Sequence, residues 1–463
     1  MKLLLRPIRL GYLWLVVGIL TWNSCQRDET VIPDQPSPTA YTAAVPLAYH
    51  ELFLNLERFT PGYRPPVSAR ASAYVSWIGY EAIVAGTSGY QSLVDYYNVP
   101  NVPTADPDLE YHWPTVLTEA YTTALEYFFP TAPAEHLFSI YQTRTDFFLD
   151  FKQDLPQEVF SRSSAFGREL ATAICAWSAT DEAGHEAYLR NSDPTYQPPG
   201  GPGRWQPTYP DFSQALLPRW GDVRTFAADE SDIVADPLPY DETPGTELYL
   251  QAEEVMEKVN EIKTGGLEED FWIAQFWSDD CPILTFTPSG RWYAVANQLV
   301  VRHNMRMDEA VALYARMGMA LNDAGVRAWH EKYRFNYLRP IDYIRAVMPD
   351  QQAWNTVMCP DGSGNYFTPN FPAYPSGHAT FSAAAIKVLE AYFGANTGMI
   401  DRCHEGRSEF NGAPRQFQTF RQMAEENAYS RIPLGVHFQM DSDEGLLLGY
   451  GIGDKINQLP WER

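Results

Sequence analysis

The chain has 463 residues, a formal net charge of -24 and 45% hydrophobic residues. So negative a chain would repel the phosphates of nucleic acid, and any anion site within it must be a local, enclosed concentration of positive charge. The length and the apolar content allow one large or two medium domains with a sizeable core.

The N-terminus has the pattern of an export signal. Three basic residues precede an apolar run at residues 10–21, which is shorter than the roughly 20 residues of a membrane-spanning helix. Cys25 then stands where a bacterial lipoprotein carries its lipid acceptor. We therefore expect residues 1–25 to be a lipoprotein-type signal and residues 26–44, polar and proline-rich, to be a disordered tether. This predicts a periplasmic or cell-surface lipoprotein; a secreted protein or a retained anchor is the alternative.

Beyond the tether, apolar residues recur at helical spacing, while alternating strand patterns between hairpin turns are scarce. The pattern predicts an all-α fold of packed helical bundles, with an N-terminal bundle at residues 45–190 and a C-terminal bundle at residues 247–463 that carries the site. The predicted helices cover residues 46–59, 67–85, 116–129, 133–151, 159–177, 247–262, 271–277, 293–302, 307–334, 381–393, 419–430 and 435–456.

Between the two predicted bundles, residues 191–246 are rich in Pro, Gly, Trp and Tyr. An exposed linker is one interpretation. Because so long an irregular stretch in a compact protein more often has a function, we expect it to fold over the mouth of the site.

Four cysteines follow Cys25 in the chain, and they lack the CxxC spacing of a zinc site. An exported protein can form disulfides, and four cysteines allow three pairings. A bond between Cys359 and Cys403, across the loops around the second block described below, is one candidate. The sequence does not choose among the pairings of Cys175, Cys281, Cys359 and Cys403.

Three short blocks in the last third of the chain carry the candidate chemistry. They are KYRFNYLRP at residues 332–340, PSGH at residues 375–378 and SRIPLGVHFQMD at residues 430–441. Together they supply three cations, a hydroxyl, a glycine amide and two histidines, which is what an anion with four or five oxygens needs. This set predicts a site for phosphate or a phosphate-like anion, and its members are Lys332, Arg339, Arg431, Ser376, Gly377, His378 and His437.

In the first block, Lys332 and Arg339 lie seven residues apart, which is two helical turns, so on one helix they would share a face. Pro340 is expected to end that helix at Arg339. The block therefore predicts two cations that point the same way near a helix terminus.

The second block precedes residues 379–393, a small and apolar run that predicts a buried helix. The unpaired N–H groups and the positive dipole end at the start of such a helix favour an anion. Gly377 would let the ligand approach the backbone closely.

In the third block, Pro433 interrupts the backbone, so the next helix is expected to begin near His437. Asp441, four residues further, can accept a hydrogen bond from one ring nitrogen of His437. That bond fixes the tautomer and makes the other nitrogen a better nucleophile or metal ligand.

Each block alone has an ordinary structural explanation: a solvated helix face, a capping serine or a structural His–Asp pair. The conjunction of all three, in this order and spacing, favours a functional site.

The combined pattern K-x6-RP, PSGH and SR-x5-H-x3-D is complete over residues 332–441. It resembles the superfamily shared by type 2 phosphatidic acid phosphatases, bacterial acid phosphatases and vanadium-dependent haloperoxidases, which are helical proteins with one anion pocket. The flanking residues resemble the vanadium chloroperoxidases and their bacterial relatives. The resemblance rests on Trp329, on FPAYPSGHAT at residues 371–380, on RIPLGVH at residues 431–437 and on FWSDDCPILTFTPSGRW at residues 276–292. Ala379 stands where the phosphatases more often have Thr.

The resemblance implies a vanadate cofactor and a reaction of halide with hydrogen peroxide that gives hypohalous acid. Lys332, Arg339 and Arg431 would neutralise the equatorial oxygens of vanadate. The Ser376 hydroxyl and the Gly377 amide would add hydrogen bonds.

The resemblance also implies that His437, oriented by Asp441, bonds the metal at an axial position. His378 would lie opposite as the acid or base. Trp329 and Phe371 would flank the route of the halide, although ordinary aromatic packing explains them as well. The aspartate of the preceding loop, Asp280, would hold the arginine of the third block.

A phosphomonoesterase would use the same atoms, and this alternative stays open at the level of sequence. There His437 would attack phosphorus and form a phosphohistidine, while His378 would protonate the leaving oxygen. A non-catalytic surface binding protein with a relict pocket is a third possibility, but no ligand position is missing. The halide, the physiological ligand, the organic acceptor and the oligomeric state are not determined by the sequence.

Overall fold

Helices form almost all of the regular structure, as the all-α prediction requires. The computed structural model describes residues 36–281, 284–360 and 365–463. Within these ranges thirteen α-helices accompany three short 3-10 helices and one two-stranded antiparallel sheet. The α-helices are α1 (Ala44–Phe59), α2 (Pro65–Val84), α3 (Trp113–Phe128), α4 (Ala134–Lys152), α5 (Gln157–Ser178), α6 (Glu247–Lys263), α7 (Glu268–Phe276), α8 (Gly290–Arg302), α9 (Met307–Phe335), α10 (Pro340–Val347), α11 (Gly377–Phe393), α12 (Phe420–Tyr429) and α13 (Gln439–Asn457); the 3-10 helices are η1 (Pro38–Ala40), η2 (Ala187–Leu189) and η3 (Trp220–Asp222), and the strands are β1 (Met399–Asp401) and β2 (Arg415–Phe417).

The twelve predicted helices all correspond to observed ones, and α10 was missed. Pro340 was taken only as the end of the preceding helix, yet it is also the first residue of α10. Proline suits that position because the first helical residue needs no N–H partner. The strands β1 and β2 were missed because each has only three residues.

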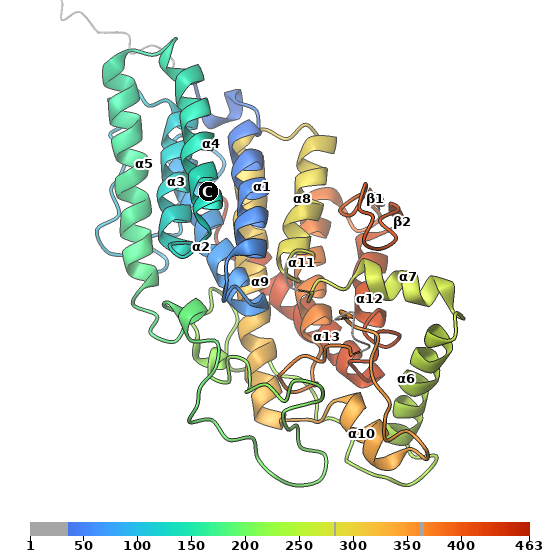
Figure 1. Ribbon diagram of the computed structural model, residues 1–463. Coiled ribbons are helices and arrows are strands. Elements are labelled where there is room, and N and C mark those ends of the chain that lie inside the picture. The colour runs from blue at the N-terminus through green and yellow to red at the C-terminus, as the bar shows by residue number, and fades with distance from the viewer. Residues whose placement is uncertain (1–35, 282–283, 361–364) are drawn as a thin grey trace, which may run out of the picture. The chain divides into compact units, whose positions relative to one another are not determined.

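The 29-residue helix α9 is the axis of the described part of the chain (Figure 1). Helix α2 packs along it, and all twenty residues of α2 are buried. Helices α11 and α13 pack against each other and against α9. The buried residues of the N-terminal and the C-terminal helices consequently form one continuous core around α9.

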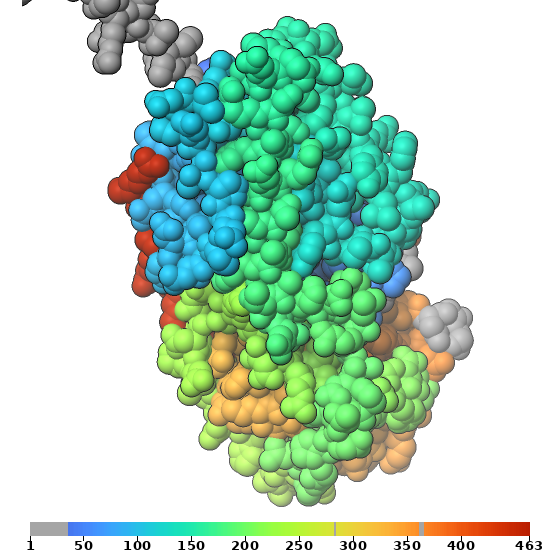
Figure 2. All heavy atoms as spheres, turned by 90° about the vertical axis from the view of Figure 1, so that its left-hand side faces the viewer, coloured from blue at the N-terminus to red at the C-terminus, as the bar shows by residue number. Residues whose placement is uncertain are grey.

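Residues 191–246 are irregular apart from η3 and lie against α9 and the loops that follow it; they appear in green below the N-terminal helices in Figure 2. The carbonyl of Leu216 accepts a hydrogen bond from Trp329 Nε1 at 3.3 Å. The buried carboxylate of Asp323 on α9 accepts three backbone N–H bonds from residues 226–228. These contacts fix the segment on α9.

The predicted signal at residues 1–25, with Cys25, and the first ten residues of the predicted tether lie outside the described residues. The rest of that tether, residues 36–44, is folded. There the carbonyl of Tyr41 accepts the backbone N–H of Met307 at 3.1 Å. In the described ranges no helix is long and apolar enough to cross a membrane.

The disulfide joins Cys281 to Cys359, so the suggested pair of Cys359 and Cys403 is wrong. Cys281 lies in the loop between α7 and α8, and this loop meets the loop of Cys359. Cys403 follows β1 and lies instead beside Gln298 of α8, with 3.2 Å between Sγ and Nε2. Cys175 is buried and also free. Sequence spacing could not show which loops meet.

Candidate active site

The first block lies on two helices, not on one. Asn336 has φ 47°, and this left-handed residue ends α9 at Phe335. Arg339 is therefore the residue before α10, and the predicted shared helix face for Lys332 and Arg339 is wrong. Both side chains are nonetheless fully buried and reach the same pocket region, because the short turn redirects the chain.

In the second block, Ser376 caps α11, and its Oγ accepts the N–H of Ala379 at 3.4 Å. The first N–H groups of α11, beginning with Gly377, have no partner within the helix, as in any helix. The backbone N–H of Ser376 donates to the carbonyl of Asp441 at 2.8 Å. This bond ties the start of α11 to the start of α13, so the second and third blocks are held together.

In the third block, His437 lies two residues before α13, and Asp441 lies in its first turn. Nδ1 of His437 is 2.8 Å from Oδ2 of Asp441, the bond that the spacing predicted. The same carboxylate accepts the N–H of Phe438 at 3.1 Å. Nη1 of Arg339 donates to Nε2 of His437 at 3.1 Å. The first and third blocks therefore meet at this ring nitrogen.

Three buried side-chain nitrogens in this region have no hydrogen-bond partner in the described part of the protein. They are Nη2 of Arg339, Nε of Arg431 and Nε2 of His378. Buried polar groups in folded proteins nearly always have a partner. Two unpaired guanidinium N–H groups beside an imidazole suit the oxygens of a tetrahedral or trigonal-bipyramidal oxyanion such as vanadate or phosphate. The residues present therefore fit the group that the sequence predicted.

Lys332 is bonded to the backbone of the loop before α11, and its predicted contact with the anion stays a prediction. Its Nζ donates to the carbonyls of Pro372, Ala373 and Pro375 at 3.0, 2.7 and 2.5 Å. These three bonds use all three ammonium hydrogens. Lys332 thus holds the loop before α11 and contributes positive charge from behind it. Burial, followed by the charge of Arg339, keeps its pKa well below the usual value.

Asp280 connects two of the blocks. Its Oδ2 pairs with Nη2 of Arg431 at 2.5 Å and lies 3.7 Å from Nε2 of His378. Burial alone would raise the pKa of Asp280, but the charges of His378, when that ring is protonated, and of Arg431 outweigh burial and lower it. Asp280 is therefore an ionised carboxylate that holds Arg431, which is the contact implied by the resemblance.

Both histidines are held in the neutral form. Burial, reinforced by the charge of Arg431, lowers the pKa of His378 to about 3. Burial and the nearby Arg339 lower the pKa of His437 well below its usual value. Burial raises the pKa of Asp441 to about 7 against the opposing charge of Lys332. Neutral imidazoles can donate an electron pair to a metal or accept a proton.

An apolar wall faces the polar groups. The rings of Trp329 and Phe371 lie 4.9 Å apart, and both are buried. They line a small pocket together with Asp280, Gly377, His378, Arg431, His437, Phe381 and the prolines Pro65, Pro288 and Pro369. None of the residues in 191–246 is among the described residues that line this pocket or the cavity beside it. The segment contacts the pocket residue Trp329 through Leu216, and its covering of the mouth stays a prediction.

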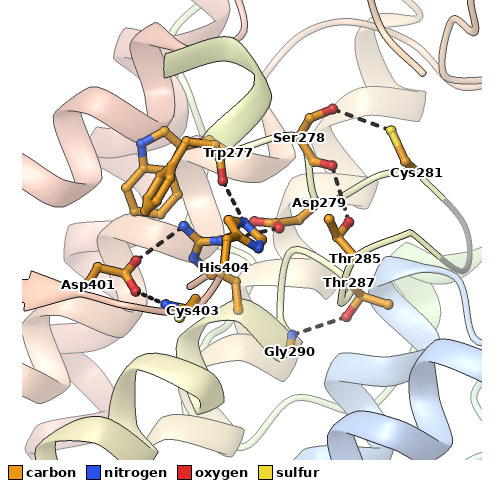
Figure 3. Close-up of polar contacts among 12 residues, drawn as sticks. Trp277, Ser278, Asp279, Cys281, Thr285, Thr287, Gly290, Asp401, Cys403 and His404 are labelled. Atoms are coloured by element: carbon orange, nitrogen blue, oxygen red, sulfur yellow. Dashed lines mark hydrogen bonds and ion pairs between the residues drawn. The ribbon is translucent and has the colours of Figure 1, made fainter. Parts of the chain in front are cut away.

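A second buried charge cluster includes Asp279, the residue before Asp280, together with Asp401 and His404 (Figure 3). Arg291 is within 3.5 Å of Asp279 and 3.1 Å of Asp401, and it donates to Nε2 of His404 at 2.5 Å. Sequence reasoning missed this cluster. The adjacent acidic pair at residues 279–280 was the only signal, because the partners come from α8, from β1 and from the loop after β1.

Comparisons with known proteins agree with this geometry. The family model for the VCPO second helical-bundle domain matches residues 312–460. Vanadium chloroperoxidase from Curvularia inaequalis is 28% identical over 325 residues, which is 57% of this chain and 50% of that protein. Vanadium-dependent bromoperoxidase from Ascophyllum nodosum is 34% identical over 93 residues, 18% of this chain and 16% of that protein. The chain thus spans half or less of the length of these relatives.

Solved structures extend the likeness over most of the chain. The crystal structure of a bacterial vanadium-dependent iodoperoxidase has a TM-score of 0.77 and 26% identity, and the match covers 91% of this chain and 97% of that one. A bacterial vanadium-dependent chloroperoxidase has a TM-score of 0.67 at 15% identity, covering 87% and 93%, and shows the fold alone. The fold and the site together define a helical protein with a buried pocket whose residues suit an oxyanion. In sequence and in fold the chain is similar to proteins of the vanadium haloperoxidase superfamily.

Proposed function

We propose that this protein is a vanadate-dependent haloperoxidase, which oxidises a halide ion with hydrogen peroxide and a proton to hypohalous acid and water. The observation that carries the proposal is the meeting of the unpaired nitrogens of Arg339, Arg431 and His378 around the pocket lined by His437. The likeness to the bacterial iodoperoxidase over 91% of the chain supports it.

Arg339 and Arg431 would hold the oxygens of vanadate with their unpaired N–H groups. Ser376 Oγ and the Gly377 amide, at the start of α11, would add hydrogen bonds. When bound, vanadate supplies a Lewis acid that activates peroxide.

His437 is prepared to be the protein's ligand to the metal. With Nδ1 as the donor to Asp441, Nε2 carries the electron pair, which accepts a hydrogen bond from Arg339 Nη1 and would bind the metal in place of that contact. Because burial keeps the ring neutral, no proton has to leave before binding. Asp441 therefore acts through His437.

His378 is prepared to move a proton. Its Nε2 is buried and has no hydrogen-bond partner among the described residues, and burial keeps the ring neutral. We infer that this nitrogen accepts a proton from hydrogen peroxide and returns one to the leaving oxygen. Asp280, 3.7 Å away, stabilises the protonated form in between.

Trp329 and Phe371 would give the halide an apolar approach. Their rings line the pocket, and the Phe371 ring packs against the guanidinium of Arg339 with 4.8 Å between the guanidinium carbon and the ring centroid. A halide that reaches this wall loses part of its hydration, which makes it a better nucleophile.

The rival function, phosphomonoester hydrolysis, is favoured by one observation. The neutral Nε2 of His437, oriented by Asp441, would serve equally well as a nucleophile toward phosphorus. Both functions use the same residues, so activity measurements must separate them.

The test is to incubate the purified protein with orthovanadate and to remove the excess. Oxidation of chloride, bromide and iodide by peroxide is then compared with hydrolysis of p-nitrophenyl phosphate by the vanadate-free protein. We expect vanadate-dependent halide oxidation, lost in His437→Ala. Phosphatase turnover without vanadate, combined with no halide oxidation after loading, would replace the proposal by the phosphatase function. Vanadate-dependent turnover in His437→Ala would show that the metal ligand is misassigned.

We also propose that the protein is exported and anchored to a membrane through a lipid on Cys25, on the basis of its N-terminal sequence. The test is fractionation of cells that express the full chain or Cys25→Ser. The full chain should be found with the membranes and Cys25→Ser in the soluble extracytoplasmic fraction. Equal distribution of the two would contradict a lipid anchor.

A further inference from the structure

A cavity of about 320 Å³ lies beside the oxyanion pocket. The two share four lining residues: Pro65, Asp280, Pro369 and Phe371. This volume is at the lower end of the roughly 300–1,000 Å³ of small-molecule sites, and it is more room than a monatomic halide needs. The cavity therefore has space for an organic molecule next to the place where hypohalous acid would form.

The walls of this cavity are largely aromatic. Four phenylalanines line it, together with prolines from the turn before α2 and from the loop before α11. Such surfaces favour a flat, apolar ring that can stack or meet them edge to face. The phenylalanines are Phe59, Phe286, Phe367 and Phe371.

Arg64 places a positive charge beside these aromatic rings. It is the residue before α2, and its guanidinium carbon lies 5.9 Å from the ring centroid of Phe367. Burial lowers its pKa, and the charge of Asp280 opposes that effect. In the described ranges its guanidinium forms no hydrogen bond and no ion pair. A partly buried guanidinium without such partners favours an anionic ligand.

The carboxyl groups that line the cavity are engaged elsewhere. Glu57 accepts the N–H of Thr287 at 3.0 Å. Asp280 pairs with Arg431, and Asp279 faces Arg291 at 3.5 Å. Two arginines line the cavity, and Arg58 already has an interaction partner of its own. Arg64 is therefore the cation best placed to meet the charge of a ligand there.

We propose that this cavity binds a small aromatic carboxylate, with the carboxylate on Arg64 and the ring among the phenylalanines. One part of this proposal rests on the proposed haloperoxidase function, namely that the bound ligand accepts the halogen. In that step the ring attacks the halogen of hypohalous acid. A carbon–halogen bond forms, the oxygen–halogen bond breaks, and the ring proton leaves with the hydroxide as water.

The test measures binding alone, by ligand-observed NMR titration of the full folded protein without vanadate, halide or peroxide. The probes are benzoate and its neutral analogue benzyl alcohol. Arg64→Gln should weaken benzoate binding about tenfold, because a charge-assisted hydrogen bond is lost, and should change benzyl alcohol binding less than twofold. Arg64→Lys, which keeps the charge but not the planar fork, should lie between the wild type and Arg64→Gln.

Arg302→Gln is the matched control, because Arg302 is exposed at the end of α8 and is not among the described residues that line the cavity. It should leave the binding of both probes unchanged. Absence of benzoate binding to the wild type would overturn the proposal. So would an equal loss of both probes in Arg64→Gln, or unchanged benzoate binding in that variant. Halide oxidation is not part of this measurement. A failure of the binding proposal can therefore be told apart from a failure of the proposed haloperoxidase function.

Discussion

Asp280 and Arg431 form an ion pair with 2.5 Å between Oδ2 and Nη2, and both side chains are buried. The two residues are 151 positions apart in the chain. The pair fixes the guanidinium so that its Nε remains unpaired at the pocket. The orientation of Arg431, in the loop between α12 and α13, thus depends on a carboxylate outside its own block.

Replacing Asp280 by Asn should therefore disturb Arg431 more than it disturbs the fold. We expect vanadate affinity to fall at least about tenfold, as is typical when a group that orients a ligand residue is lost. The free energy of unfolding should fall by about 3 kcal/mol, because a buried charge loses its partner. Vanadate titration and urea denaturation measure the two effects. The exposed Asp236→Asn should change neither, and an Asp280→Asn protein with wild-type vanadate affinity would contradict this role.

Asp441→Asn tests how His437 is oriented. Its neutral amide oxygen is a weaker acceptor for the Nδ1 proton and for the N–H of Phe438 than the carboxylate is, and its NH2 group can donate to the ring and favour the other tautomer. We expect halide oxidation to decrease about 10- to 100-fold and vanadate affinity to decrease as well. Asp443→Asn, two residues further on the exposed face of α13, is the matched control. If both variants behave alike, the His–Asp pair has no special part in the site.

The disulfide joins Cys281, the residue after Asp280, to Cys359 and closes a loop of 78 residues. By the chain-entropy relation such a loop is worth about 4 kcal/mol of stability. We expect the double variant Cys281→Ser, Cys359→Ser to have a lower melting temperature in calorimetry. Its vanadate affinity should also fall by more than the loss of folded protein alone can explain. Cys403→Ser, at a free cysteine, should affect vanadate affinity little. Equal effects of the two changes would show that the disulfide does not position Asp280.

Glu57 should make stability depend on pH. Burial raises its pKa from 4.5 to about 7 in the folded protein, so between these values the folded state binds more protons than the unfolded state. The stability that Glu57 contributes is present below pH 4.5 and is lost as the pH rises through 7. The loss is on the order of 3 kcal/mol.

Glu57→Gln resembles the protonated acid and should flatten this part of the pH profile. Urea denaturation of both proteins at steps from pH 4.5 to pH 8 measures the difference. A Glu57→Gln profile parallel to that of the wild type would show that Glu57 is not the group responsible.

The helices and the pocket residues were predictable because their signals are local. The helical spacing of apolar residues predicted twelve helices, and the four-residue spacing of His437 and Asp441 predicted their hydrogen bond. The prediction that Lys332 and Arg339 share a helix face was wrong, because Asn336 adopts a left-handed conformation that spacing does not reveal.

Features that depend on distant loops could not be predicted from spacing. The partner of Cys359 is 78 residues away in a loop that only the fold brings near. Arg64 lies in the turn before α2, far in sequence from all three blocks, and has no motif of its own. The resemblance to a known family supplied Asp280, which spacing alone would not have found.

The most direct measurement is a crystal structure of the protein loaded with orthovanadate. We predict vanadium bonded to Nε2 of His437, with its oxygens facing the unpaired nitrogens of Arg339 and Arg431 and with His378 on the opposite side. Vanadium bonded to His378, or vanadate bound only outside this pocket, would contradict it.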